Sequence, residues 1–186
     1  MAKILICVDC QYDFIEGGNL PVDGGTQALD YLARYVADHS NEYDCVVMTL
    51  DWHPGNHCSF TENGGIWPNH CVRYTRGASI YDPLAKALPV KKTVFFEKGC
   101  KVNKDEYSFL GNRKNVNRFA DIIDSLRPDA IDVCGIAGDV CVMNTIKDLL
   151  SLESLPCINV IMPAVASLND DTFAQFVAEQ HMNIVR

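Results

Sequence analysis

The chain has 186 residues, of which 48% are hydrophobic, and its formal net charge is −8 at pH 7. This length is sufficient for a sizeable core, so we expect one globular domain over residues 1–186. The acidic balance argues against nucleic acid and against anionic membranes as partners.

The N-terminal apolar run is too short for a signal peptide, and no apolar run reaches the length of a membrane span. These features predict a cytoplasmic protein. Its nine cysteines are then expected to be reduced thiols, most of them buried as small hydrophobic residues.

Short apolar runs alternate along the chain with segments of helical periodicity. We predict strands at 3–9, 44–51, 92–98, 129–135, 157–163 and 183–186, and helices around 29–36, 116–126, 142–150 and 173–177. The runs are rich in Val, Ile and Leu, which is typical of parallel strands buried on both faces. The alternation predicts an α/β fold with a doubly wound, mainly parallel six-stranded sheet and helices on both faces.

Residues 52–91 interrupt this alternation. They contain glycines, prolines, both tryptophans and three of the five histidines, with little periodicity. A loop of this length is usually functional or disordered, and its aromatic and histidine content favours a functional loop.

Reactive side chains stand at the ends of the predicted strands. Asp9, Asp51 and Lys98 each close a strand, and Cys141 opens the helix that follows the fourth strand. Because ligands bind beyond the carboxyl ends of the strands in open α/β sheets, we expect these groups to converge.

Cys141 is the candidate nucleophile. Asp139 can cap its helix, and the positive helix end together with a nearby Lys98 would lower the pKa of the thiol. Asp9 can transfer protons and orient the lysine, while backbone N–H groups of the first helical turn can form an oxyanion hole. The alternative, held equally open, is a buried cysteine that packs the helix onto the sheet.

The long loop also contains a candidate metal site. Asp51 and His53 are one residue apart on extended chain, so their side chains share a side, and His57 and His70 follow. Two histidines and one carboxylate form a ligand set that leaves positions open and suits zinc, iron or manganese. The alternative is a solvated loop with ordinary histidines.

Cys7 and Cys10 have the spacing of a redox or zinc pair. Positions three apart in a strand point to opposite faces, so we do not expect such a site here.

Taken together, these motifs resemble those of a known family. The chain is similar, nearly end to end, to the isochorismatase-like cysteine hydrolases, and within them to the nicotinamidase (pyrazinamidase) group. The segments that carry the resemblance are 9-DCQYDF-14, 51-DWHPGNHCSF-60, 67-WPNHCV-72, 75-TRGA-78, 97-EKG-99 and 135-GIAGDVCV-142.

The resemblance implies a specific set of site residues. They are a catalytic triad of Asp9, Lys98 and Cys141, an oxyanion hole made by the N–H groups of Ala137 and Cys141 beside a cis Ile136–Ala137 peptide bond, a divalent metal ion on Asp51, His53 and His70, and a substrate pocket formed by Phe14, Trp67, Tyr107 and Ile136. Zinc is favoured over iron and manganese. His57 is a ligand in some members and lies outside the ligand set in others, and Glu62 stands in a region where some members use an acidic residue.

The resemblance further implies hydrolysis of nicotinamide to nicotinate and ammonia through a thioester on the cysteine, as in NAD salvage. The alternative is another small-amide or ureido hydrolase of the same family. The partner is then a small-molecule substrate, and a homo-oligomer is left open. Gly138, Val140 and Pro163 depart from the family pattern, which leaves the substrate range open.

Overall fold

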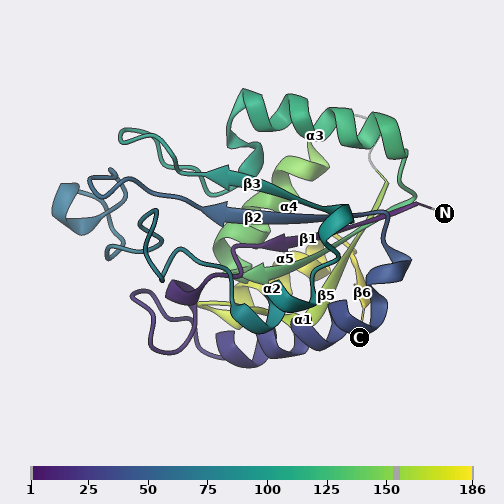
Figure 1. Ribbon diagram of the computed structural model, residues 1–186, viewed down its shortest axis with the longest axis horizontal. Helices are drawn as coiled ribbons and strands as arrows, with labels where there is room; N and C mark the ends of the chain where they lie inside the picture. The colour runs from purple at the N-terminus through teal and green to yellow at the C-terminus, as the bar shows by residue number, and fades with distance from the viewer. Residues whose placement is uncertain (1, 153–155, 186) are drawn as a thin grey trace.

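The computed structural model describes residues 2–152 and 156–185, and within them six strands form one sheet in the order β3-β2-β1-β4-β5-β6 (Figure 1). Every strand pairing is parallel. The strands are β1 (Lys3–Val8), β2 (Cys45–Asp51), β3 (Thr93–Lys98), β4 (Ala130–Ile136), β5 (Cys157–Ala166) and β6 (Asn183–Val185). The predicted α/β fold with a six-stranded sheet is confirmed.

Helices cover both faces of the sheet (Figure 1). On one face lie α1 (Gly25–His39) and α2 (Asp82–Ala87), and on the other lie α3 (Arg113–Leu126), α4 (Met143–Leu150) and α5 (Asp170–Glu179). Alternate residues of β1 pack into the two separate cores, with Leu5 and Cys7 facing α1 and Ile4 and Ile6 facing the opposite layer. Burial on both faces explains why the strands read as continuous apolar runs.

The sheet grows in two directions from β1. The chain first adds β2 and β3 on one side of β1, and it then returns to place β4 on the other side. Such a reversal of strand order leaves a crevice at the carboxyl ends of the two central strands, which is where α/β proteins bind ligands. In Figure 1 the arrowheads of β2 and β3 point to this end, and the long loop extends beyond it.

The long segment 52–91 contains more structure than its sequence predicts. It includes α2 and short 3-10 turns at Thr61–Asn63 and Val90–Lys92. Helix α2 has only six residues, which is too short for a periodic apolar pattern to stand out. Isolated bridges also order the loop, pairing His53 with Val72 and Phe60 with Trp67.

The cysteines follow the expectation of reduced, mostly buried thiols. The structure records all nine as free, and six of them are buried. Cys7 Sγ lies 3.8 Å from Cys134 Sγ on the neighbouring strand, whereas Cys10 Sγ donates to the Val8 carbonyl. None of the helices formed by the described residues has the length and apolar character of a membrane span.

Candidate active site

Four side chains from three strand ends and one helix start meet in the crevice. Lys98 Nζ lies 2.8 Å from Asp9 Oδ2, 2.6 Å from Asp51 Oδ1 and 3.4 Å from Cys141 Sγ. The parallel pairing of β2 with β3 sets Asp51 directly beside Lys98. All four residues are buried, so the structure brings together the reactive groups that the strand ends predicted.

Burial and neighbouring charges act in opposite directions on these groups. Burial lowers the pKa of Lys98, but Asp51 and Asp9 outweigh it and hold this pKa well above its usual value. Burial raises the pKa of Asp51, but Lys98 and His53 outweigh it and hold this pKa well below its usual value. Burial also raises the pKa of Asp9, and there it outweighs Lys98. The protonated Lys98 therefore faces Asp51, which stays ionised, and Asp9, whose carboxyl group binds a proton more readily than a free aspartate does.

The predicted low pKa of Cys141 is wrong. Burial, together with the charges of Asp9 and Asp51, raises the pKa of the thiol well above its usual value, although Lys98 acts in the opposite direction. Asp9, Asp51 and Cys141 each offer one atom within 4.8 Å of the others. The thiol therefore needs a base at hand, and Asp9 is a carboxylate within reach.

Cys141 lies in a π-helical turn, Gly138–Val142, that leads into α4. The predicted capping of this helix by Asp139 is wrong, because its carboxylate accepts hydrogen bonds from Leu168 N and Asn169 N, each at 2.9 Å. Asp139 thus ties the cysteine turn to the start of α5. The Ile136–Ala137 peptide bond is cis, as the resemblance implies.

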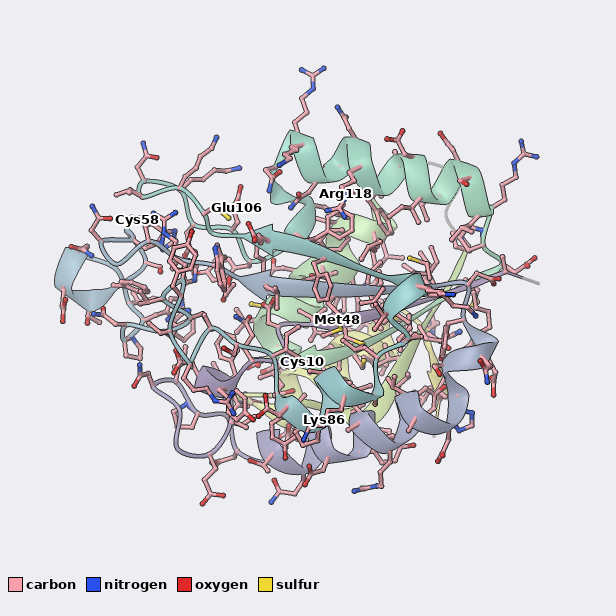
Figure 2. The ribbon with its side chains drawn as sticks, viewed as in Figure 1. Cys10, Met48, Cys58, Lys86, Glu106 and Arg118 are labelled. Atoms are coloured by element: carbon pink, nitrogen blue, oxygen red, sulfur yellow. The ribbon has the colours of Figure 1, made fainter. Side chains whose placement is uncertain are left out.

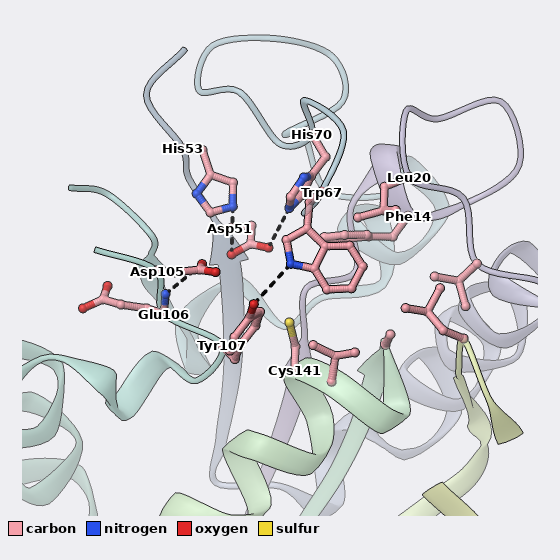
Figure 3. A pocket seen from close by; sticks show the side chains of 14 residues that line it. Phe14, Leu20, Asp51, His53, Trp67, His70, Asp105, Glu106, Tyr107 and Cys141 are labelled. Atoms are coloured by element: carbon pink, nitrogen blue, oxygen red, sulfur yellow. Dashed lines mark hydrogen bonds and ion pairs between the residues drawn. The ribbon is translucent and has the colours of Figure 1, made fainter. Parts of the chain in front are cut away.

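Asp51 also belongs to a second group of buried ligand atoms (Figure 3). Its Oδ1 lies 3.4 Å from His53 Nε2, and its Oδ2 lies 3.7 Å from His70 Nε2. The Nδ1 atoms donate to backbone carbonyls, that of His53 to Gly99 at 3.0 Å and that of His70 to Pro68 at 2.7 Å. Since a carbonyl only accepts, Nδ1 carries a proton in both rings, and in the neutral imidazole Nε2 is then the atom with the free lone pair on the side of Asp51.

This donor set fits a divalent metal ion. One ligand atom from each of Asp51, His53 and His70 lies within 4.8 Å of the other two, and all three side chains are buried. Two imidazoles and one carboxylate match the preferences of zinc, iron and manganese. Backbone carbonyls behind the two imidazoles are the usual partners that orient histidine ligands.

His57 and Glu62 lie outside this group. His57 Nε2 donates to the Lys104 carbonyl at 3.0 Å, and its Nδ1 lies 2.7 Å from Ser59 Oγ. The ring of His57 instead packs on that of His53, with centroids 4.2 Å apart. The Glu62 side chain is exposed on its 3-10 turn.

Two further residues, which the sequence did not single out, fix the candidate metal ligands. The Gln11 side chain spans the backbone of Asp51, donating to its carbonyl at 2.8 Å and accepting from its N–H at 2.9 Å. Asp13 Oδ2 accepts from the N–H of Cys71, the residue after His70, at 2.6 Å. The available signal was their position in 9-DCQYDF-14, at alternate positions after Asp9.

A small cavity opens onto both groups (Figure 3). Trp67 and Tyr107, from different loops, join across it through a 3.2 Å hydrogen bond from Trp67 Nε1 to the Tyr107 hydroxyl. Its lining consists of Phe14, Leu20, Val22, Asp51, His53, Trp67, His70, Asp105, Glu106, Tyr107, Ala137, Val140, Cys141 and Leu168. Ile136 is not part of this lining. As the last residue of β4 it is fully buried in the core beneath α1.

The sequence matches a known domain family over most of its length. Residues 3–183 match the model described as the isochorismatase domain. The chain is 34% identical over 174 residues to the nicotinamidase/pyrazinamidase of Mycobacterium tuberculosis, covering 91% of this chain and 89% of the relative. It is 31% identical over 167 residues to the nicotinamidase of Escherichia coli, covering 81% of this chain and 77% of the relative.

Solved structures agree with this match. The pyrazinamidase of Pyrococcus horikoshii in complex with zinc superposes with a TM-score of 0.85 at 30% identity, over 100% of this chain and 99% of the other. PnC1 of L. infantum in complex with nicotinate has a TM-score of 0.83 at 29% identity, over 100% and 92% of the two chains. This chain belongs to the isochorismatase-domain family.

Proposed function

We propose that this protein hydrolyses nicotinamide to nicotinate and ammonia. The observation that carries the proposal is one cavity that reaches both a buried cysteine with its carboxylate and lysine and a set of three metal ligands. The names of the bacterial relatives and the nicotinate bound to PnC1 of L. infantum support the same substrate class. The zinc in the Pyrococcus horikoshii structure supports a metal ion at this site.

The proposed reaction uses Asp9, Lys98 and Cys141. Asp9 takes the thiol proton of Cys141, and the thiolate attacks the carboxamide carbon. The backbone N–H groups of Ala137 and Cys141 hold the resulting oxyanion. Asp9 then returns the proton to the nitrogen, the carbon–nitrogen bond breaks and ammonia leaves. Water cleaves the thioester, which gives nicotinate and restores the thiol. Lys98 stays protonated and balances the charge.

A divalent metal ion on Asp51, His53 and His70 would supply a Lewis acid for the pyridine nitrogen of the substrate, which is meta to the carboxamide. Zinc is the metal that we propose, with iron and manganese as alternatives. Phe14, Trp67 and Tyr107 would hold the ring between aromatic walls. The chain's own contribution is therefore to orient the carboxamide toward Cys141.

The nucleophile assignment is tested by ammonia release from nicotinamide. Cys141→Ala removes the attacking sulfur, so we expect activity to fall by roughly 10⁴-fold or more. Cys157→Ala is the matched control because it deletes an exposed thiol elsewhere, and it should keep full activity. Retained ammonia release in Cys141→Ala would refute the proposed mechanism.

A panel of small amides and ureido compounds tests the alternative within the family. Preference for nicotinamide and pyrazinamide supports the proposal, whereas preference for an N-carbamoyl substrate would contradict it. Val140 is the reason to test another amide or ureido substrate. It lines the cavity together with Cys141 and departs from the family pattern. A single domain, the cytoplasmic location, the absence of nucleic acid and membrane partners and the oligomeric state stay predictions.

A further inference from the structure

We propose that Glu106 is a positioning residue for His53 and that it acts through Gly99. The inference rests on the metal site of the proposed function. Glu106 lies in the loop beyond the carboxyl end of β3 (Figure 2), and only 6% of it is exposed. A carboxylate this buried needs partners, and both of its oxygens have one.

The first oxygen reaches His53 through a single residue. Glu106 Oε2 accepts the N–H of Gly99 at 3.0 Å, and the carbonyl of Gly99 accepts Nδ1–H of His53 at 3.0 Å. This second bond keeps the proton on Nδ1 and leaves the Nε2 lone pair for the metal ion. The position of the His53 ring therefore depends on where Gly99 is held.

Gly99 also touches the imidazole directly. A Cβ atom at position 99 would overlap Cε1 and Nδ1 of His53, so the ring lies against the bare Cα. Gly99 has φ +62°, a left-handed conformation that glycine adopts readily but does not prefer strongly. Glu106 supplies the restraint that this backbone position lacks.

The second oxygen supports the other side of the ring. Glu106 Oε1 pairs with Lys104 Nζ at 2.8 Å, and the carbonyl of Lys104 accepts Nε2–H of His57 at 3.0 Å. His57 in turn packs on His53 with ring centroids 4.2 Å apart. Residues 104–106 thus hold the two neighbours of the His53 ring, Gly99 and His57. His57 therefore supports His53 by packing.

Zinc affinity of the full-length protein, measured by competition with a chromogenic chelator, tests the proposal. Glu106→Ala leaves Gly99 without its acceptor, and loss of a partner behind a ligand weakens metal binding by about 10–100-fold. Glu106→Gln keeps an amide oxygen for the Gly99 N–H but loses the charge. Since a neutral acceptor forms a bond of about half the strength, we expect zinc binding to weaken by no more than about threefold.

Glu97→Gln is the matched control. It removes one negative charge from an exposed position on β3, next to Lys98, and should bind zinc as wild type does. Wild-type affinity in Glu106→Ala would overturn the proposal. Equal weakening in Glu106→Gln and Glu106→Ala would also overturn it, because charge alone would then explain the effect. Thermal unfolding curves establish that each variant is folded. If Glu106→Ala did not fold, the near-isosteric Glu106→Gln would still be compared with wild type.

His70→Ala separates this inference from the function on which it rests. That variant removes a proposed ligand, so its zinc affinity should fall further than that of Glu106→Ala. If His70→Ala bound zinc as tightly as wild type, the metal site itself would be wrong. If His70→Ala lost zinc while Glu106→Ala kept it, only the role of Glu106 would fail.

Discussion

One buried lysine joins the two halves of the candidate site. Lys98 contacts Asp9, the proposed base, and also Asp51, the proposed metal ligand. A buried cation with two carboxylates is stable only while their geometry is kept, because an unpaired buried charge is strongly destabilising. The position of Asp51 therefore affects the metal ligands and the nucleophile together.

Gln11→Leu tests this dependence at a single residue. The change removes the two hydrogen bonds that hold the Asp51 backbone and leaves buried polar groups without partners. We expect the free energy of unfolding to fall by about 1–3 kcal/mol, as is typical for such groups, and ammonia release to fall with it. Urea denaturation and the ammonia assay measure the two effects.

Gln175→Leu is the control for that change. It deletes the same amide from the exposed face of α5, where the amide donates a hydrogen bond to Glu179, so it should alter neither quantity. Wild-type stability and activity in Gln11→Leu would contradict the role given to Gln11.

At the scale of elements, the cysteine turn depends on close packing against the loop after β5. A Cβ atom at Gly138 would overlap Ser167 Oγ and crowd Val165. Asp139 ties the same turn to the backbone at 168–169. Ser167 thus occupies the space that a side chain at position 138 would need.

Gly138→Ala should therefore shift the turn that carries Cys141. We expect lower ammonia release and a lower unfolding temperature, because overpacking of a close-packed interior is destabilising by about 1–3 kcal/mol. Adding Ser167→Gly removes the nearest obstacle and should restore part of both losses. If the double variant were no better than Gly138→Ala, Ser167 would not be the group that excludes a side chain there.

At the scale of the whole molecule, the two ends of the sheet differ in character. The carboxyl ends hold the candidate site, whereas the amino ends hold a buried polar network around Asp132 of β4. Asp132 accepts from the Tyr43 hydroxyl at 2.6 Å, pairs with Lys3 at 3.1 Å and accepts from Asn159 at 2.6 Å. These bonds connect β1, β4 and β5 far from the cavity.

This network predicts a loss of stability at alkaline pH. Burial, followed by the hydrogen bond to Asp132, raises the pKa of Tyr43 well above that of a free tyrosine. The contribution of the neutral phenol is fully present below the unfolded pKa of about 10 and is lost as the pH rises beyond it. The free energy of unfolding should then fall by about 1.4 kcal/mol per pH unit from this group.

Between pH 9 and 11, the free energy of unfolding of Tyr43→Phe should depend less steeply on pH than that of wild type. The slope should differ by up to about 1.4 kcal/mol per pH unit, the contribution of one titrating proton. Urea denaturation across that range measures the slope. Tyr74→Phe, at a residue that is 86% exposed, should leave the slope unchanged. An equally steep slope in Tyr43→Phe would contradict the assignment to Tyr43.

The sequence by itself determined the strand and helix alternation and the residues at the strand ends. Strands that are buried on both faces appear in the sequence as continuous apolar runs. The ends of these runs therefore predicted β1 to β4 to within one residue at each end. The end of β5 was missed because its pairing with β4 shifts register between Val133 and Gly135. Helix α2 was missed because six residues carry too little periodicity.

Only the tertiary structure decided the electrostatics and the supports of the candidate site. The pKa of Cys141 rises because burial and two carboxylates act together, and neither distance nor burial is encoded in local spacing. The partners of His57 were also not encoded in local spacing. Its two nitrogens bind the Lys104 carbonyl and the Ser59 hydroxyl and do not face Asp51. Local periodicity specifies which face of an element is buried, whereas the partners of each polar group depend on segments far apart in the chain, and these meet only in the folded molecule.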